Sequence, residues 1–293
     1  VQSAYRATLR DHAVRVLQDE QAAARRVVQS ARDRLAQSLS NTRAANNAVS
    51  LSTKCAAEDA GNCSQIRNNL FASGETFASL SVNGATTGAD TRTATISLAR
   101  EFAPSPETRW GLMLRAAQSE DDAAGVFSGN ITTRAGSLGL YGVTALGEGL
   151  YLDGFMMVGR SRQSVALRTD AISITSDYWT SNSLAGLSLS GSHSVGQYTL
   201  LPTLSATVAR GQIEAMNSDV RGFDLVAEDI ATDLGSVRYS EITFSPEVRR
   251  NLSTAGTGYI ALVPQVSCTD SNTAALRDGC RTAAEIKLQL ENA

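Results

Sequence analysis

The stretch that most constrains the fold is residues 183–210, SLAGLSLSGSHSVGQYTLLPTLSATVAR, because its side chains alternate in character at every second position. That period predicts β-strands, and the short break at 194–197 predicts that two strands form a hairpin. One face of the second strand carries Leu200, Pro202, Leu204, Ala206 and Val208. The opposite face carries Thr199, Thr203, Ser205 and Thr207. A polar face that is small and uncharged is typical of a wall with lipid on one side and a narrow wet lumen on the other.

Composition excludes several classes of protein. A net charge of −3 over 293 residues argues against a nucleic-acid partner, and the length suits one large β domain or two ordinary domains. No apolar run approaches about 18 residues, which excludes a spanning helix but not a barrel, whose alternating strands are only half apolar. The chain begins at Val1 without a signal peptide, so we expect it to be the interior of a longer precursor.

The four cysteines fall into two local pairs in polar, turn-rich stretches, Cys55 with Cys63 and Cys268 with Cys280. Of the three connectivities that four cysteines allow, the local one closes two short loops, each gaining roughly 2–3 kcal/mol. A zinc site would need closer cysteine spacing and an adjacent histidine, and neither occurs. The pattern favours two disulfides in an oxidising compartment; the alternative is four unrelated thiols.

Residues 1–47 are predicted to form one long α-helix. This segment contains no Gly or Pro and is rich in Ala, Arg, Gln and Leu, all strong helix formers. Leu17, Val28 and Leu39 mark an apolar stripe at eleven-residue spacing, close to the period of a straight helix. The helix would reach about 70 Å. Two interpretations stay open: a stalk that assembles with partners, or a helix threaded into or projecting from a pore.

A polar linker at residues 48–74 holds the first cysteine pair, and the rest of the chain, 75–293, alternates as strands. We predict ten strands, several of which are longer than soluble sheets need but near the about 9–11 residues of a tilted spanning strand. They lie at 76–83, 92–102, 109–119, 132–145, 150–166, 183–193, 198–213, 235–249, 258–266 and 282–291.

The links between these strands alternate in length. Short links are predicted at 103–108, 146–149, 194–197 and 251–257. Long loops are predicted at 120–131, 167–182, 214–234 and around the second cysteine pair. Outer-membrane barrels combine short periplasmic turns with long outer loops in this way, although a soluble meander can show it by chance.

The few aromatic residues gather near the short links. A membrane interface selects Trp and Tyr at one height, because the ring is apolar and its tip is wet; the alternative is that strand ends favour aromatics in general. The candidate interface residues are Phe102, Trp110, Tyr151, Tyr198 and Tyr259.

Charged residues opposite the apolar strand faces are candidates for the lumen. If the apolar faces contact lipid, these side chains project inward and need water or a partner of opposite charge. The alternative is ordinary solvent exposure of one sheet face. The candidates are Arg115, Glu241, Glu285 and Lys287.

The sequence offers no catalytic or cofactor motif. It contains no nucleophile elbow, zinc-protease motif, P-loop or EF-hand pattern, and two histidines provide little for a serine triad. Acidic residues at 120–122 and 228–233 could bind Ca²⁺ weakly, but a solvated acidic loop is the simpler interpretation. We expect no cofactor, no metal and no enzymatic activity.

Residues 139–162, GLYGVTALGEGLYLDGFMMVGRSR, resemble the middle of an autotransporter (type V secretion) translocator barrel. The hairpin at 183–210 and the Pro-bearing strand YIALVPQ at 259–265 resemble later parts of the same domain, so the resemblance covers about 75–293. It implies an antiparallel up-and-down transmembrane β-barrel of about 12 strands in the outer membrane of a Gram-negative bacterium. It also implies a helix in the pore and a passenger exported ahead of it, with no chemistry in the barrel.

Two features depart from that family. Ten strands are visible, and the chain ends at Ala293 without the terminal aromatic strand that barrel-assembly machinery reads, so we expect the barrel to be incomplete at its C-terminus. The helix is also longer than a pore segment needs. The pairs Asn46-Asn47 and Asn68-Asn69 lack the motif that surrounds self-cleavage sites in the family.

The sequence therefore predicts an outer-membrane barrel that anchors or translocates an N-terminal passenger, with long loops and N-terminal segment facing the cell exterior. Expected partners are the lipid bilayer, the chain's own helix or passenger, and barrel-assembly machinery. The alternative is a structural or adhesive surface protein whose long helix assembles with partners, without secretion. A secreted enzyme such as an esterase would place its activity before Val1.

Overall fold

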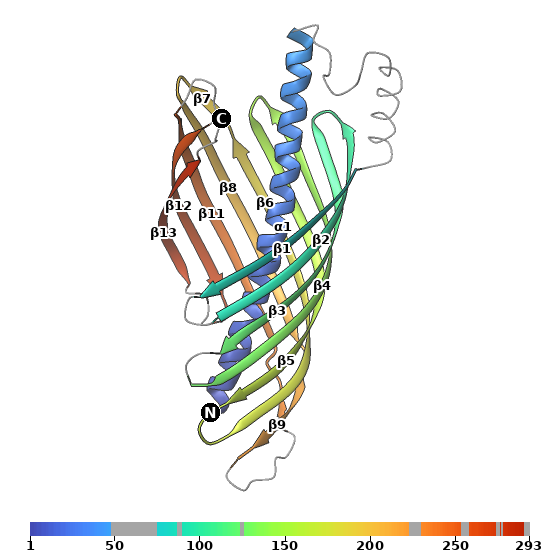
Figure 1. Ribbon diagram of the computed structural model, residues 1–293, viewed down its shortest axis with the longest axis vertical. Helices are drawn as coiled ribbons and strands as arrows, with labels where there is room; N and C mark the ends of the chain where they lie inside the picture. The colour runs from blue at the N-terminus through green and yellow to red at the C-terminus, as the bar shows by residue number, and fades with distance from the viewer. Residues whose placement is uncertain are drawn as a thin grey trace.

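The computed structural model describes residues 1–47, 75–86, 90–123, 126–222, 230–252, 258–273, 276 and 278–289. One long helix, α1 (Gln2–Asn47), lies against an antiparallel sheet that curls around it (Figure 1). The strands are β1 (Glu75–Thr86), β2 (Asp90–Ser105), β3 (Thr108–Ala123), β4 (Ser128–Gly147), β5 (Leu150–Arg168), β6 (Ser173–Gly191), β7 (His193–Val195), β8 (Tyr198–Ile213), β9 (Met216–Arg221), β10 (Ile230–Thr232), β11 (Ser236–Asn251), β12 (Tyr259–Ser271) and β13 (Gly279–Gln289).

The strands follow one another through the sheet in chain order. The main path is β1-β2-β3-β4-β5-β6-β8-β11-β12-β13, while β7 pairs with β8 and β9 pairs with β6 and β10. The ten strands of this path correspond to the ten that alternation predicts. The expected fold class, a mainly antiparallel up-and-down sheet preceded by a long helix, is confirmed.

The two ends of the sheet differ in their connections. We call the end with the links β2–β3, β4–β5, β7–β8 and β11–β12 the turn end, and the end with β3–β4, β5–β6 and β8–β11 the loop end. At the turn end, Gly149 and Gly196 take positive φ angles of 69° and 60° in two-residue hairpin turns, a conformation that such turns require and that glycine adopts without strain.

The half of the sheet next to the turn end is apolar outside and largely polar inside. On β3, Leu112 and Leu114 are 46% and 54% exposed on the outer face, while Arg115 is buried on the inner face. On β8, Leu204 is exposed outside and Thr207 is buried inside. This half has the polarity that the sequence predicts.

The half next to the loop end has the opposite polarity. Its inner face carries buried apolar side chains such as Ile131, Val165 and Ile174, which join the helix in one hydrophobic cluster. Its outer face is polar, with Asp177 and Ser164 exposed. A sheet with an apolar inside and a polar outside is the arrangement expected in water. The predicted polarity, with an apolar face toward lipid and a small polar face toward a wet lumen, is therefore corrected for this half.

Two of the predicted long loops are mainly strand, which corrects the sequence interpretation. Residues 120–131 belong mostly to β3 and β4, and 167–182 mostly to β6, which begins at Ser173. The reversal of polarity weakens the contrast between faces there, although Ile174 and Tyr178 still point inward at period two. The longer β8–β11 connection carries the short strands β9 and β10.

The helix runs along the inside of the sheet from the loop end to the turn end (Figure 1). At about 1.5 Å per residue its 46 residues extend about 70 Å. No helix among the described residues is both long and apolar enough to cross a membrane.

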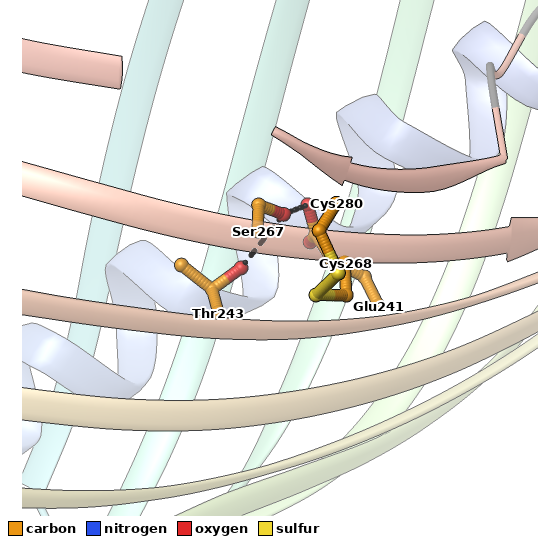
Figure 2. Close-up of a disulfide and its surroundings, with 5 residues drawn as sticks. All are labelled: Glu241, Thr243, Ser267, Cys268 and Cys280. Carbon is orange, nitrogen blue, oxygen red and sulfur yellow. Dashed lines mark hydrogen bonds between the residues drawn. A yellow bond between two sulfur atoms is a disulfide. The ribbon is translucent and has the colours of Figure 1, made fainter. Parts of the chain in front are cut away.

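A disulfide joins Cys268 on β12 to Cys280 on β13, where the two residues are direct cross-strand partners (Figure 2). It closes a loop of sequence separation 12 next to the last described strand. Cross-linking a loop of this size restricts the unfolded chain and adds roughly 2–3 kcal/mol. The predicted pair Cys55 and Cys63, with the linker 48–74, lies outside the described residues.

Candidate functional site

The helix is seated on the inner wall by a continuous buried stripe. Leu17, Val28 and Leu35 are at most 3% exposed, and the intervening small residues Ala24 and Ala31 are fully buried. Small side chains let a helix approach its neighbour closely, so the stripe predicted from spacing becomes the contact face. The site with functional potential is therefore the bore together with the helix that occupies it.

At the loop end the helix is held by an apolar cluster with a polar centre. The Tyr5 hydroxyl lies 2.8 Å from Ser176 Oγ and 3.1 Å from Ser218 Oγ, and its ring packs edge-on against Phe127 with 6.2 Å between centroids. Nearby, Arg10 donates to the backbone carbonyls of Leu234 and Asn272 at 2.9 and 3.0 Å. These contacts hold the first turns of the helix to β6, β9 and the β12 end.

About two turns beyond Tyr5, a fully buried histidine contacts the wall. His12 Nε2 lies 2.8 Å from Thr133 Oγ1, and His12 Nδ1 lies 3.0 Å from Asp121 Oδ2. Asp121 is 4% exposed and belongs to β3, which corrects the interpretation of 120–122 as a solvated acidic loop for this residue. Among the described residues, no group of His, Cys, Asp and Glu is arranged to hold a metal ion.

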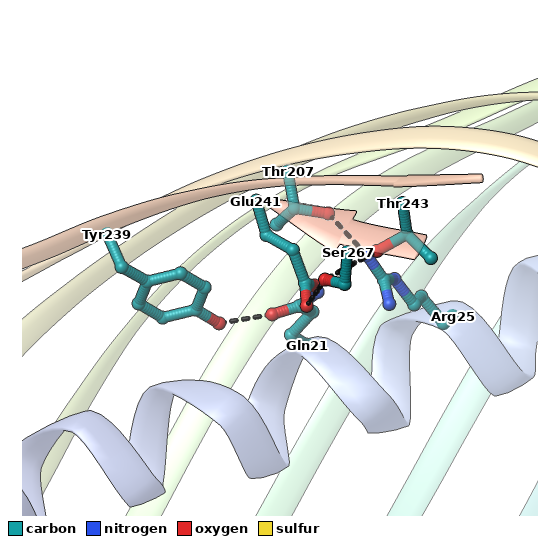
Figure 3. A network of polar contacts seen from close by, with 7 residues as sticks. All are labelled: Gln21, Arg25, Thr207, Tyr239, Glu241, Thr243 and Ser267. Carbon is teal, nitrogen blue, oxygen red and sulfur yellow. Dashed lines mark hydrogen bonds and ion pairs between the residues drawn. The ribbon is translucent and has the colours of Figure 1, made fainter. Parts of the chain in front are cut away.

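Midway along the helix, the helix contributes the acid of an ion pair and the wall contributes the base. Glu20 on the helix is fully buried, and its Oε1 lies 3.9 Å from Nη1 of Arg115 on β3. The next helical position, Gln21, starts a network with the opposite wall (Figure 3). Buried charges are tolerated only where a partner of opposite charge or a hydrogen bond stabilises them. Here the helix supplies one member of each pair and a strand of the wall supplies the other.

Figure 3 shows that network, which centres on Glu241 of β11. Arg25 Nη2 lies 3.3 Å from Glu241 Oε2 and donates to Thr207 Oγ1 at 3.0 Å. Gln21 Nε2 donates to the same carboxylate at 3.2 Å, and Gln21 Oε1 accepts from the Tyr239 hydroxyl. Ser267 Oγ donates to Glu241 Oε1 at 2.9 Å. The carboxylate therefore fixes both the height and the rotation of the helix.

Near the turn end a second acid is shared between helix and wall. Glu101 of β2 is 2% exposed and receives Arg34 Nη2 of the helix at 2.7 Å. Arg109 Nη1 of β3 donates to its other oxygen at 2.8 Å, and the Tyr141 hydroxyl donates at 3.2 Å. Arginine held by an ionised carboxylate in a dry setting is among the stronger polar contacts in proteins.

A further helical arginine borders a cavity. Arg32 Nη1 donates to Ser190 Oγ at 2.8 Å and lies 3.8 Å from Asp153 Oδ2. Beside it, a polar cavity of about 980 Å³ separates the helix from β5, β6, β8, β11 and β12. Here Arg32 of the helix supplies the cation, and Asp153 of the wall supplies the anion.

The four lumen candidates all lie on the inner face, in two groups. Arg115 and Glu241 contact the helix as described. Lys287 Nζ lies 3.2 Å from Glu247 Oε2 across the cavity wall, and 3.9 Å from Glu285, whose side chain is 66% exposed. Lys287 therefore faces the cavity and pairs with wall carboxylates.

The five aromatic candidates are divided between the faces. Phe102 and Trp110 stack on the outer face with centroids 4.6 Å apart, and Tyr198 is 53% exposed on the outer face. Tyr151 and Tyr259 line the inner cavity, with the Arg249 guanidinium 3.9 Å above the Tyr259 ring. The expectation for these last two is corrected, because parity along β5 and β12 turns their rings inward.

Sequence reasoning missed several residues that the structure brings together. The helix side contributes His12, Glu20, Arg25, Arg32 and Arg34, and the wall side contributes Glu101, Asp121 and Asp153. The available signal was parity, because each wall acid lies on the face opposite the exposed apolar residues of its strand. Outward-facing Trp179 was also missed, since its segment was interpreted as a loop.

Gly159 of β5 leaves room for Glu20 of the helix to approach the wall. Our first prediction concerns the replacement of this glycine by a larger residue. A Cβ at inward-facing Gly159 would lie 2.8 Å from Ser137 Cβ and 3.3 Å from Glu20 Oε1. Gly159→Val should therefore lower the free energy of unfolding by about 1–3 kcal/mol through overpacking, measured by urea titration in liposomes. At outward-facing Gly136 a Cβ meets nothing within 4 Å, so Gly136→Val should be neutral; equal losses at both positions would contradict close helix seating.

Comparisons with known proteins bear on this geometry. A family model described as the autotransporter beta-domain matches residues 71–238. The fold is similar to the beta domain of the Bordetella autotransporter BrkA, with a TM-score of 0.51 and 16% identity over 73% of this chain and 82% of that chain. It also aligns with the translocator domain of autotransporter NalP from Neisseria meningitidis, with a TM-score of 0.49 and 14% identity over 83% and 90%. No protein of curated function matches the sequence.

Proposed function

Because this chain belongs to the autotransporter β-domain family, whose members translocate a passenger across the bacterial outer membrane, we propose that helix α1 ties the passenger to the bore through which it leaves. The chain stands in the outer membrane as the translocating barrel of that family. The finer proposal concerns the helix: residues 1–47 fill the pore, 48–74 link them to the wall, and 75–293 form the barrel.

One observation carries this proposal, the pairing of charges between helix and wall. Arg25, Arg32 and Arg34 meet Glu241, Asp153 and Glu101, while Glu20 meets Arg115. A helix that merely collided with the sheet would leave buried charges unanswered, at several kcal/mol each. The complementarity supports a helix that ends its transit in this position and then remains as a plug and anchor.

The same contacts support an orientation. The first helical residues lie at the loop end and Arg34 lies near the turn end, and outer-membrane barrels place their short turns in the periplasm. A segment joined to the N-terminal end of the helix would then stand at the cell surface. The proposal assigns the barrel passage and anchoring and no chemical step.

The proposed partners follow from the two surfaces. The exposed apolar face, with Leu114 and Leu204 among its members, suits the lipid bilayer, and insertion of such a wall calls for barrel-assembly machinery. The buried stripe of the helix packs against the wall of the same chain, so self-assembly through the helix is the secondary proposal. No nucleic-acid partner is proposed.

Surface display tests this function. A short epitope is joined to the N-terminal end of α1 in the natural protein, expressed in a Gram-negative host. We expect antibody binding on intact cells and removal of the epitope by added protease, while the barrel itself resists and shows heat-modifiable migration on gels. An inserted, heat-modifiable barrel with its epitope buried in the periplasm would overturn translocation and favour the structural alternative.

A further inference from the structure

The outer face of the sheet changes from apolar residues to arginines along several strands. Reading toward the loop end, Leu138 on β4 is followed by Arg134, and Val158 on β5 by Arg160 and Arg162. Val208 on β8 is followed by Arg210, and Ile242 on β11 by Arg238. Each arginine lies within four residues of an exposed apolar side chain of its own strand. These positions mark the edge of the apolar band at the loop end.

Four of these arginines form two directly opposed pairs, which we call the arginine girdle. Arg134 and Arg162 are cross-strand partners between β4 and β5, and Arg210 and Arg238 are partners between β8 and β11. Side chains at such positions share a face with their Cβ atoms about 5 Å apart, and like charges there destabilise a sheet. All four are exposed.

The protein's own carboxylates neutralise little of the positive charge of these four arginines. Arg162 Nη2 lies 3.6 Å from Asp177 Oδ2, and Arg210 Nη2 donates to the Gln212 amide oxygen at 3.5 Å. Within the described part of the chain, no carboxylate lies in ion-pair contact with Arg134, Arg210 or Arg238. By contrast, Glu214 lies 2.5 Å from the neighbouring Arg160.

An aromatic residue indicates where the arginine girdle lies relative to the membrane surface. Trp179 on β6 is the cross-strand partner of Arg162, is 40% exposed on the outer face, and stacks under the Arg160 guanidinium at 4.7 Å. Tryptophan concentrates where hydrocarbon meets water. In a chain that stands in an outer membrane, the girdle therefore lies at the level of lipid headgroups.

From these observations we propose that the arginine girdle binds the phosphate groups of anionic lipid headgroups in the leaflet next to the loop end. Guanidinium groups engage phosphate through paired, charge-assisted hydrogen bonds, and a phosphate between two opposed arginines converts their repulsion into two attractions. The occupant is membrane lipid, because the girdle adjoins the apolar band and not the loop tips. This inference goes beyond translocation and does not require the helix to carry a passenger.

The test compares liposomes of phosphatidylcholine with liposomes of phosphatidylcholine mixed with lipid A, a phosphorylated bacterial lipid. For Arg134→Gln/Arg162→Gln and for Arg210→Gln/Arg238→Gln we expect an about thirtyfold fall in lipid A affinity per pair, the change expected when two arginines leave a membrane surface. In phosphatidylcholine alone the same variants should unfold no earlier than wild type, because a like-charge contact is removed. A merely structural role would lower stability in both lipids.

The matched control removes the same charge from the same face, away from the membrane. Arg168 and Arg221 are exposed at the loop tips, and Arg168 lies about 20 Å beyond Arg162 along β5. Arg168→Gln/Arg221→Gln should keep wild-type lipid A binding, and Arg134→Lys/Arg162→Lys should restore most of it. Heat-modifiable migration shows that each variant is folded.

Four outcomes would overturn the proposal: no preference of wild type for lipid A, equal losses in the girdle and control variants, stabilisation by free sodium phosphate equal to that by lipid A, or a preference for soluble polyglutamate over lipid A. The third would indicate a free anion site, and the fourth an acidic macromolecule. None of them bears on surface display of the epitope.

Discussion

Glu101→Gln is expected to lower the free energy of unfolding by about 3–5 kcal/mol, the cost of breaking a buried ion pair on one side. The substitution keeps the shape of the side chain but removes the charge that Arg34 and Arg109 share at 2.7 and 2.8 Å. Among the described residues the carboxylate paired with Arg109 is that of Glu101, so this guanidinium, whose side chain is 7% exposed, loses that partner. Because Arg34 belongs to the helix, the loss also weakens the hold of the wall on the helix near the turn end.

Two measurements separate these effects. Urea titration of the protein in liposomes gives the stability change, and ion conductance across a planar bilayer should rise as the helix loosens. The matched control is Glu120→Gln, which removes an exposed carboxylate from the outer face of β3, where its partner is Asn130 at 3.1 Å. We expect that variant to stay within about 0.5 kcal/mol of wild type. Unchanged stability and conductance in Glu101→Gln would mean that the helix is held by apolar contacts alone.

The strand pattern was predictable because it depends on local side-chain chemistry. Residues 198–213 were predicted with the bounds that β8 has, since Leu204, Ala206 and Val208 alternate there with Ser205 and Thr207. The start of β6 was missed because polarity reverses where the sheet leaves the membrane. At Ile174 and Tyr178 the apolar side points inward to the helix, so a search for apolar-outside strands fails.

The orientation of single aromatic residues was also within reach of the sequence but was misjudged. Tyr151 stands two positions from Asp153, which is buried on the inner face, and Tyr259 stands two positions from Ala261, which is 2% exposed on the inner face. Because side chains two positions apart on a strand lie on the same face, both rings belong on the inner face. Nearness to a short link favours an interfacial aromatic, but strand parity decides which face it occupies.

The pairing of helix and wall could not be predicted from local sequence. Arg34 and Glu101 are 67 positions apart, and Arg25 and Glu241 are 216 apart. Which helical arginine meets which wall acid depends on the height and rotation of a straight helix inside a curved sheet. Sequence indicates a basic helix face and scattered inward acids; only the three-dimensional arrangement turns them into a matched interface.

Met156→Arg tests the membrane assignment itself and is expected to cost about 2–4 kcal/mol, the range for arginine near the midplane of a barrel wall. Met156 is 65% exposed on the outer face of β5, and its cross-strand partners Leu140 and Ala185 are also outward and apolar. An exposed methionine in water would tolerate arginine almost without cost, so the size of the loss reports what surrounds it. Urea titration in liposomes measures it.

The control is Ser164→Arg, on the same face of the same strand, about 26 Å further toward the loop end. Ser164 is exposed and donates to Asp177 Oδ1 at 2.5 Å, so the new guanidinium would stand beside a carboxylate above the girdle, and we expect no loss. A cost at Met156 with none at Ser164 places the boundary of the hydrocarbon between them, where Trp179 and the arginine girdle lie. Equal small effects at both positions would instead mean that water covers the whole outer face, and the apolar residues along β3, β4, β5 and β8 would need another partner than lipid.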